Sequence, residues 1–208
     1  MRYLLFFCFC FLFLHTSAQV KPIYFDGDKI TPNKEKATSY AIYGKLSTED
    51  LWIVKKYDLW DNLTLTGSYK DEELKIAQGT FTFYAFIDAF NYANNEFFKI
   101  SKGKERFVSQ KGQYIDGLQQ GRWFTYYPDG NVFSYQDFVD GKAQGEFKIF
   151  DKLGNVLTSG NYLDGQTNGE WFFDKGTKRA VFENGVLKST ENVKKKKKVK
   201  ATVNQKLN

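Results

Sequence analysis

Between residues 112 and 187, hydrophobic and turn-forming positions recur with a period of 24 residues. One series places an aromatic residue just before each Asp-Gly or Asn-Gly pair, at Tyr114, Phe138, Tyr162 and, after a shorter step of 20, Phe182. A second series stands two residues before Trp123, Phe147 and Trp171, and consists of Gly121, Gly145 and Gly169. A short fixed period is typical of a small supersecondary unit that has been copied, each copy burying its apolar side against its neighbours.

Each unit is predicted to be one β-hairpin. Runs rich in aromatic residues, such as WFTYY (123–127) and EWFFD (170–174), suit a pleated sheet. The Asp-Gly and Asn-Gly pairs between the runs tolerate the positive φ angles of tight hairpin loops. The expected fold is therefore all-β, an elongated single-layer antiparallel meander of about five to six hairpins between residues 50 and 187.

Alternation of side chains along each strand predicts two aromatic ladders with a mainly structural role. Trp123, Phe147 and Trp171 form the first, on one side of the sheet. The second contains Phe138, Tyr162 and Phe182. The glycines of the second series suit either a close backbone approach or a bulge that bends the sheet.

The same pattern, less regular, extends towards the N-terminus. Residues 57–71 align without gaps on residues 150–164, so degenerate repeats are expected over 50–111 before the regular repeats of 112–187. Residues 85–95 do not fit the period. Residues 19–49 do not fit it either and are predicted to be a cap on the sheet edge, with a short helix that starts at Thr31-Pro32.

Residues 1–18 have the features of a secretory signal peptide. Arg2 precedes an apolar run of 12 residues, and Thr16-Ser17-Ala18 resembles a cleavage site. The run is shorter than the roughly 20 residues that span a bilayer, so no transmembrane span is expected after cleavage. Cleavage would remove both cysteines and the only histidine, His15. The mature chain could then form no disulfide, no Cys/His zinc site and no Ser-His-Asp or cysteine-based catalytic site.

Carboxylates are the remaining candidates for catalysis, because a pair of them can hydrolyse a glycosidic bond. Asp116, Asp140 and Asp164 recur with the turns, and turn formation explains them. Glu146 and Glu170 recur where the first regular repeat has Arg122, which indicates an exposed strand position. We therefore expect no catalytic residues, no metal site and no cofactor.

Almost all of the positive charge lies at the C-terminus. Residues 188–208 contain eight lysines and one glutamate, a charge of +7, so the total of +6 leaves 6 − 7 = −1 for the rest. This composition predicts a disordered tail. Its lysines could also contact an anionic lipid or glycan surface, and the candidate residues are Lys194, Lys195, Lys196, Lys197, Lys198 and Lys200. No nucleic-acid partner is expected, because no aromatic residues accompany them.

The regular units resemble the bacterial variant of the MORN repeat. The resemblance rests on YIDGLQQGRWFTYYPDGN (114–131), FVDGKAQGEFKIFDKLGN (138–155) and YLDGQTNGEWFF (162–173). It implies a thin sheet of hairpins used mainly for protein association and, by an older proposal, for membrane attachment. Some bacterial relatives carry an antitoxin label, but a signal peptide would direct this chain away from the cytoplasm, where such antitoxins act.

These observations favour a non-enzymatic, exported repeat protein that acts as a binding or scaffold module for an envelope protein, in the periplasm, at the cell surface or outside the cell. A second hypothesis is a surface-attached protein that binds anionic lipid or glycan through its basic tail. An antitoxin-like protein and a carboxylate-dependent glycan hydrolase are two further hypotheses.

Overall fold

The computed structural model describes residues 22–46 and 49–193. The predicted signal peptide and the candidate lysines from Lys194 to Lys200 lie outside these ranges. In the described part, fourteen strands form one open antiparallel sheet, which confirms the all-β, single-sheet prediction. The strands are β1 (Ile23–Asp26), β2 (Lys29–Thr31), β3 (Ser39–Leu46), β4 (Leu51–Asp58), β5 (Leu63–Tyr69), β6 (Gly79–Phe86), β7 (Arg106–Ile115), β8 (Leu118–Tyr126), β9 (Val132–Val139), β10 (Lys142–Phe150), β11 (Val156–Leu163), β12 (Gln166–Phe173), β13 (Lys178–Glu183) and β14 (Val186–Asn192).

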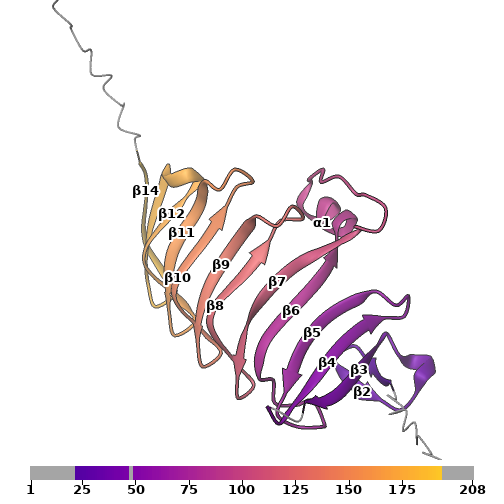
Figure 1. Ribbon diagram of the computed structural model, residues 1–208. Helices are drawn as coiled ribbons and strands as arrows, with labels where there is room; N and C mark the ends of the chain where they lie inside the picture. The colour runs from indigo at the N-terminus through magenta and orange to yellow at the C-terminus, as the bar shows by residue number, and fades with distance from the viewer. Residues whose placement is uncertain (1–21, 47–48, 194–208) are drawn as a thin grey trace, which may run out of the picture.

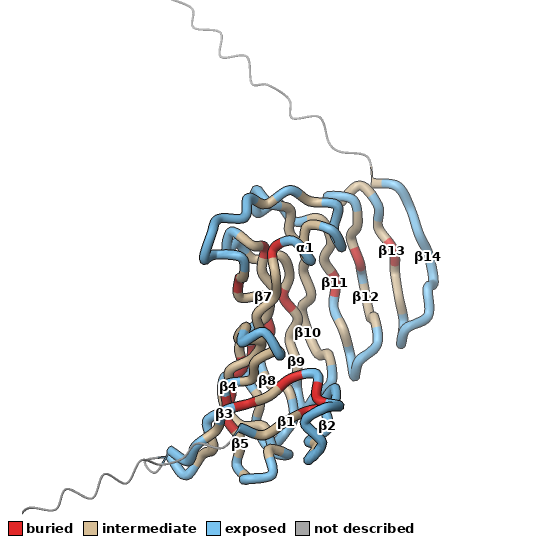
Figure 2. Tube along the Cα trace, turned by 90° about the vertical axis from the view of Figure 1, so that its right-hand side faces the viewer, coloured by how far each residue is buried: buried red, intermediate tan, exposed pale blue. Residues whose placement is uncertain are grey.

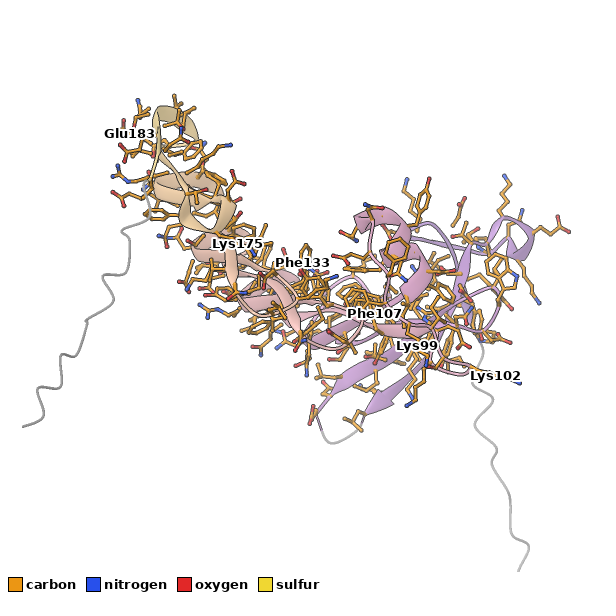
Figure 3. All side chains as sticks on the ribbon, turned by 90° about the horizontal axis from the view of Figure 1, so that it is seen from above. Lys99, Lys102, Phe107, Phe133, Lys175 and Glu183 are labelled. Carbon is orange, nitrogen blue, oxygen red and sulfur yellow. The ribbon has the colours of Figure 1, made fainter. Side chains whose placement is uncertain are left out.

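From β3 to β14 each strand pairs with the next one along the chain, as a meander of hairpins requires. The sheet is thin and strongly curved (Figures 1 and 2). Seen from above, it is a bent ribbon with Glu183 of β13 near one end (Figure 3). A sheet of this kind has no second layer, so its apolar side chains must cover one another.

The Asp-Gly and Asn-Gly pairs form two-residue hairpin loops, as predicted. Both residues of each loop have positive φ: 50° and 79° at Asp116-Gly117, and 49° and 79° at Asn184-Gly185. The flanking residues pair directly, for example Ile115 with Leu118. These angles match the type I′ turn, whose twist suits the strands that it joins.

A longer turn recurs at the opposite ends of the strands. Asp151 accepts hydrogen bonds from the backbone N–H of Leu153 at 3.0 Å and of Asn155 at 2.9 Å. Asp58 accepts equivalent bonds from Trp60 at 3.0 Å and Asn62 at 2.8 Å. The alignment of residues 57–71 with 150–164 therefore describes two copies of the same turn.

The two predicted ladders lie on the same face of the sheet, and their rings contact one another. Ring centroids are 6.3 Å apart for Trp123 and Phe138, and 5.8 Å apart for Phe147 and Tyr162. Phe147 also lies 5.6 Å from Trp171, a contact within the first ladder. We call this side of the sheet the ladder face and the other side the open face.

Large rings alternate with small residues along the ladder face. A Cβ atom added to Gly112 would lie closer than 3.0 Å to ring atoms of Trp123, and one added to Gly160 would meet Trp171 in the same way. Each tryptophan thus covers the bare backbone of a neighbouring strand, and its Nε1 donates to a carbonyl beside that glycine, Gln113 O or Asn161 O, at 3.2 Å. Both tryptophans are buried, with exposures of 3% and 4%.

The glycines of the second series act through a bulge and not through a close approach. Gly121, Gly145 and Gly169 have φ of 65°, 84° and 74°, and no ring atom lies within 4 Å of an added Cβ. Each lies beside a break in strand register, such as the shift between Lys111 and Gln113 where β7 pairs with β8. They bend the sheet, and the close approach belongs to Gly67, Gly112 and Gly160.

The predicted N-terminal cap region differs from the expectation in detail. It contributes β1, β2 and β3 to the sheet, and its helix is one 3₁₀ turn, η1 (Lys34–Lys36). The residue that caps η1 is Asn33, not Thr31, because its side chain accepts the N–H of Glu35 at 3.0 Å. Its short polar side chain can make this bond just before the first helical residue.

Residues 85–95, which break the period, contain the helix α1 (Ile87–Asn94). Phe90 on this helix packs against Phe98, Phe107, Tyr127 and Phe133, with centroid distances of 5.5 to 6.3 Å. At the C-terminus, a 3₁₀ turn η2 (Asp174–Gly176) precedes β13. The final strand β14 includes Lys188–Asn192, the start of the segment that was expected to be a disordered tail.

Candidate functional site

The open face of β8, β9 and β10 carries a cluster of aromatic side chains. Phe124 lies 6.1 Å from Tyr135 between ring centroids, and Tyr135 lies 5.8 Å from Phe150. Tyr126 stacks on Phe124 at 6.2 Å. We call these four residues the open-face cluster. They lie on this side because they alternate with ladder residues such as Trp123.

Charged side chains hold one end of the cluster. Arg122 makes a bidentate pair with Asp137, at 2.7 and 2.8 Å, and its guanidinium lies 4.0 Å from the ring centroid of Tyr135. Glu146 accepts a hydrogen bond from the Tyr135 hydroxyl at 2.5 Å and pairs with Lys148 at 2.5 Å. Arg122 also reaches Glu146 at 3.4 Å. This network covers Tyr135, which is only 8% exposed although no second layer lies over it.

The network perturbs the acidity of its members. The hydrogen bond from Lys148 and then that from Tyr135 lower the pKa of the Glu146 carboxyl. Burial, followed by the hydrogen bond to Glu146, raises the pKa of Tyr135. The hydrogen bond to Asp137 raises the pKa of Arg122. At neutral pH the site is therefore a fixed set of paired charges around a neutral phenol.

A hollow of about 390 Å³ opens beside the cluster. Phe124, Val132, Tyr135 and Phe150 line it, and Lys152 and Leu153 of the β10–β11 turn border it. Leu153 is 88% exposed, whereas the other apolar lining residues are half-buried or buried. The hollow is apolar, open to solvent and close to paired charges, a combination that also occurs in protein contact sites.

The carboxylates of the open face do not have the properties of an acid–base pair. Glu146 and Glu170 line a second hollow, next to Asn161. Glu170 pairs with Arg179, and this hydrogen bond lowers its pKa, as Lys148 lowers that of Glu146. A general acid for glycoside hydrolysis needs a raised pKa. Neither Glu146 nor Glu170 has the raised pKa of such an acid.

The strand ends joined by the long turns form one edge of the molecule, where α1 also lies. This edge carries the most exposed large apolar side chains. They lie on α1 and its following loop or on the long turns, and are Trp60 (81%), Tyr92 (93%), Phe97 (94%) and Leu153 (88%). Lys152 joins two of these segments, because it pairs with Glu96 at 2.5 Å and lies over the ring of Phe98. Lys99 and Lys102 follow in the same loop (Figure 3). We call this edge the aromatic rim.

The predicted site residues thus fall into two groups. The six ladder residues lie together on the ladder face as structural packing, while the lysines from Lys194 to Lys200 lie outside the described residues. The sequence reasoning missed the open-face cluster. Its Tyr135 occupies the position that Ser159 has one period later, so the signal was a departure from the repeat and not the repeat itself.

No group of three or more His, Cys, Asp or Glu side chains placed to hold a metal ion occurs in residues 22–46 and 49–193. Within the part of the chain that the structure describes, no helix has the length and apolar character needed to cross a membrane. Comparison of the sequence with models of protein families and with curated proteins found no match.

Proposed function

We propose that the chain is a non-enzymatic, exported repeat protein that binds another protein of the cell envelope through its open-face cluster. The observation that carries the proposal is the uncovered apolar hollow between Phe124, Tyr135 and Phe150. A hollow lined by aromatic rings suits an apolar anchor residue of a partner, and such anchors provide most of the energy in protein interfaces.

The paired charges support a binding role. They fix the orientation of Tyr135 and Arg122 before any partner arrives, so little side-chain entropy is lost on association. Their ion pairs lie partly exposed near the hollow, where charges influence specificity and association rate more than affinity. The proposed role is that of a scaffold with one pre-formed docking face.

A pull-down with matched surface variants tests this proposal. Residues 19–208 are immobilised as wild type, Leu153→Asp and Val186→Asp, and exposed to an envelope extract. Leu153 borders the hollow, whereas Val186 is an apolar residue of 58% exposure at the opposite edge. We expect a protein that wild type and Val186→Asp retain and that Leu153→Asp loses. Equal retention by all three proteins, or by none, would count against the proposal.

The aromatic rim favours a second candidate function, contact with an anionic lipid or glycan surface. Val193, which directly precedes the lysine-rich segment in the sequence, lies at this edge, where its N–H donates to Thr177 O at 2.7 Å. The exposed rings suit the apolar part of a lipid surface, and the lysines suit its anionic head groups or an acidic glycan.

Vesicles with and without anionic lipid test the second candidate, together with an immobilised acidic glycan. Binding should fall when residues 194–208 are deleted and should weaken steeply with salt. Binding that is indifferent to salt, or that persists without residues 194–208, would contradict a role for the basic tail.

A further inference from the structure

A separate hollow of about 340 Å³ lies on the ladder face, in the N-terminal half of the sheet. Three segments come together there: the β1–β2 hairpin, the loop between β5 and β6, and the first strands of the ladder. Phe25 and Asp28 come from the hairpin, and Leu74, Lys75 and Ala77 come from the loop. The irregular parts of the chain thus enclose a space that the regular repeats leave open.

The walls of this hollow are apolar and ordered by packing. Phe81 is only 2% exposed, and its ring centroid lies 4.8 Å from that of Tyr114 and 5.4 Å from that of Tyr69. Leu74 packs against the buried cluster of Phe25, Ala41 and Val54, so the loop is folded over the sheet. Burial raises the pKa of both Tyr69 and Tyr114, and these phenols stay neutral at physiological pH.

Lys56 lines the hollow, and its positive charge is poorly compensated. Its Nζ donates to Gly27 O at 3.3 Å, lies 4.4 Å from the ring centroid of Phe25, and is 3.9 Å from Asp28. The Asp28 side chain points into solvent, whereas that of Lys56 is only 20% exposed. An ammonium group has three donors, so two remain for a ligand. Burial lowers the pKa of Lys56, and a nearby anion would offset this cost.

Lys75 adds a second positive charge to the lining. Its side chain is exposed, and within the described residues it has no ion pair. The charged residues that line the hollow are therefore two lysines and one outward carboxylate, that of Asp28. This balance favours a ligand with an anionic group at one end.

We propose that this hollow binds a small amphiphilic carboxylate, with its hydrocarbon chain among Leu65, Phe81, Phe83 and Tyr114 and its carboxylate at Lys56. The volume is near the lower end of the roughly 300–1,000 Å³ of small-molecule sites, which suits a medium-chain fatty acid and not a macromolecule. The hollow lies on the opposite face from the open-face cluster. The inference therefore does not depend on the proposed partner binding.

Calorimetric titration with decanoate tests the proposal, with decanol as a neutral ligand of the same chain length. Lys56→Met keeps the apolar stem and removes the charge. The matched control is Lys55→Met, because Lys55 neighbours Lys56 on β4 but is exposed on the open face. We expect wild type and Lys55→Met to bind decanoate saturably and with similar affinity. The affinity of Lys56→Met should be lower by about ten-fold or more, in line with the loss of one hydrogen-bonded charge pair. Decanol should bind more weakly than decanoate and equally to all three proteins.

A filled-hollow variant and an open-face variant locate the site. Ala77→Phe, checked by circular dichroism for a native sheet, should abolish decanoate binding, while Leu153→Asp should leave it unchanged. The absence of saturable decanoate binding to wild type would overturn the inference. So would equal losses in Lys55→Met and Lys56→Met, or full binding by a folded Ala77→Phe protein.

Discussion

At the scale of single residues, the ladder face shows how a one-layer sheet buries large rings. Trp171 has no second sheet above it, yet it is 4% exposed because it lies flat over Gly160 and beside Phe147, Tyr162 and Phe182. The glycine is required for the space that it leaves free and not for an unusual φ angle. Gln136 occupies the equivalent position in the repeat between Gly112 and Gly160. The ring that the next strand places opposite it is that of Phe147, which is smaller than the indole of tryptophan.

Gly160→Ala should therefore destabilise the protein by about 1–3 kcal/mol, the usual cost of overpacking a tight site. The added methyl would meet the six-membered and five-membered rings of Trp171, which the surrounding aromatic residues hold in place. Urea unfolding followed by far-UV circular dichroism measures the change in the free energy of unfolding.

Gly44→Ala is the matched control, because Gly44 also lies within a strand but has nothing within 4 Å of an added Cβ. Its effect should stay within about 0.5 kcal/mol. In a Trp171→Phe background, Gly160→Ala should cost less free energy of unfolding than it does in wild type, because the smaller phenylalanine ring leaves room for the added methyl group. Equal effects of the two glycine variants would contradict the packing argument.

At the scale of elements, the long turn between β10 and β11 is stabilised by the ionised Asp151. The hydrogen bond from Lys175, at 2.9 Å, and then those from Asn155 hold the pKa of Asp151 well below its ordinary value of 3.8. A carboxyl whose pKa is lower in the folded state stabilises the fold above its unfolded pKa. This contribution is lost as the pH falls from about 4 through the lowered value.

Asp151→Asn should accordingly lower the melting temperature at neutral pH, and the gap to wild type should close as the pH falls below about 4. Asn keeps one acceptor oxygen for the turn but loses the charge that pairs with Lys175. Lys175→Met should reproduce part of this pH dependence. Thermal unfolding of the three proteins at several pH values provides the measurement, and a gap that is constant with pH would refute the electrostatic explanation.

Phe90 connects the helix α1 to four rings of the sheet and the following loop. Phe90→Ala should destabilise the protein by about 2 kcal/mol or more and should speed amide exchange throughout α1. Tyr92→Ala is the control on the same helix, because Tyr92 is 93% exposed. Hydrogen exchange in α1 that is equal for both variants would show that the helix is held in another way.

At the scale of the whole molecule, the parts that could be predicted from the sequence are those that depend on neighbours along the chain. The hairpins and their Asp-Gly turns follow from local spacing, and so does the shared turn of Asp58 and Asp151. The two ladders lie on one face because β8 and β9 pair Trp123 with Gln136, and Phe138, two residues after Gln136, points to the same side of the sheet. The hollows depend on residues that do not follow the repeat. Tyr135 departs from the residue type at its position in the repeat, and Phe25 precedes the repeats, so the repeat gave no indication of the hollows.

The repeat also predicts how the molecule tolerates deletion. Removing residues 142–165, one full period, would join the Asp140-Gly141 turn directly to β12. Trp171 would then take the place of Phe147 opposite Gln136, and every remaining strand would keep its antiparallel neighbour. Removing residues 142–154 instead deletes the single strand β10 with its turn, so β11 would follow the Asp140-Gly141 turn. Small residues of β11 would then lie beside β9, at positions where β10 supplies large rings such as that of Phe147.

The full-period deletion should give a shorter protein that still unfolds cooperatively, because the stability of a repeat array is approximately a sum over units and their nearest-neighbour interfaces. The single-strand deletion should lose its native sheet signal. Far-UV circular dichroism and urea unfolding of both deletions distinguish these outcomes. Because each hairpin buries its rings only against the adjacent hairpins, a full-period deletion that unfolds completely would mean that contacts beyond nearest neighbours hold this curved sheet together.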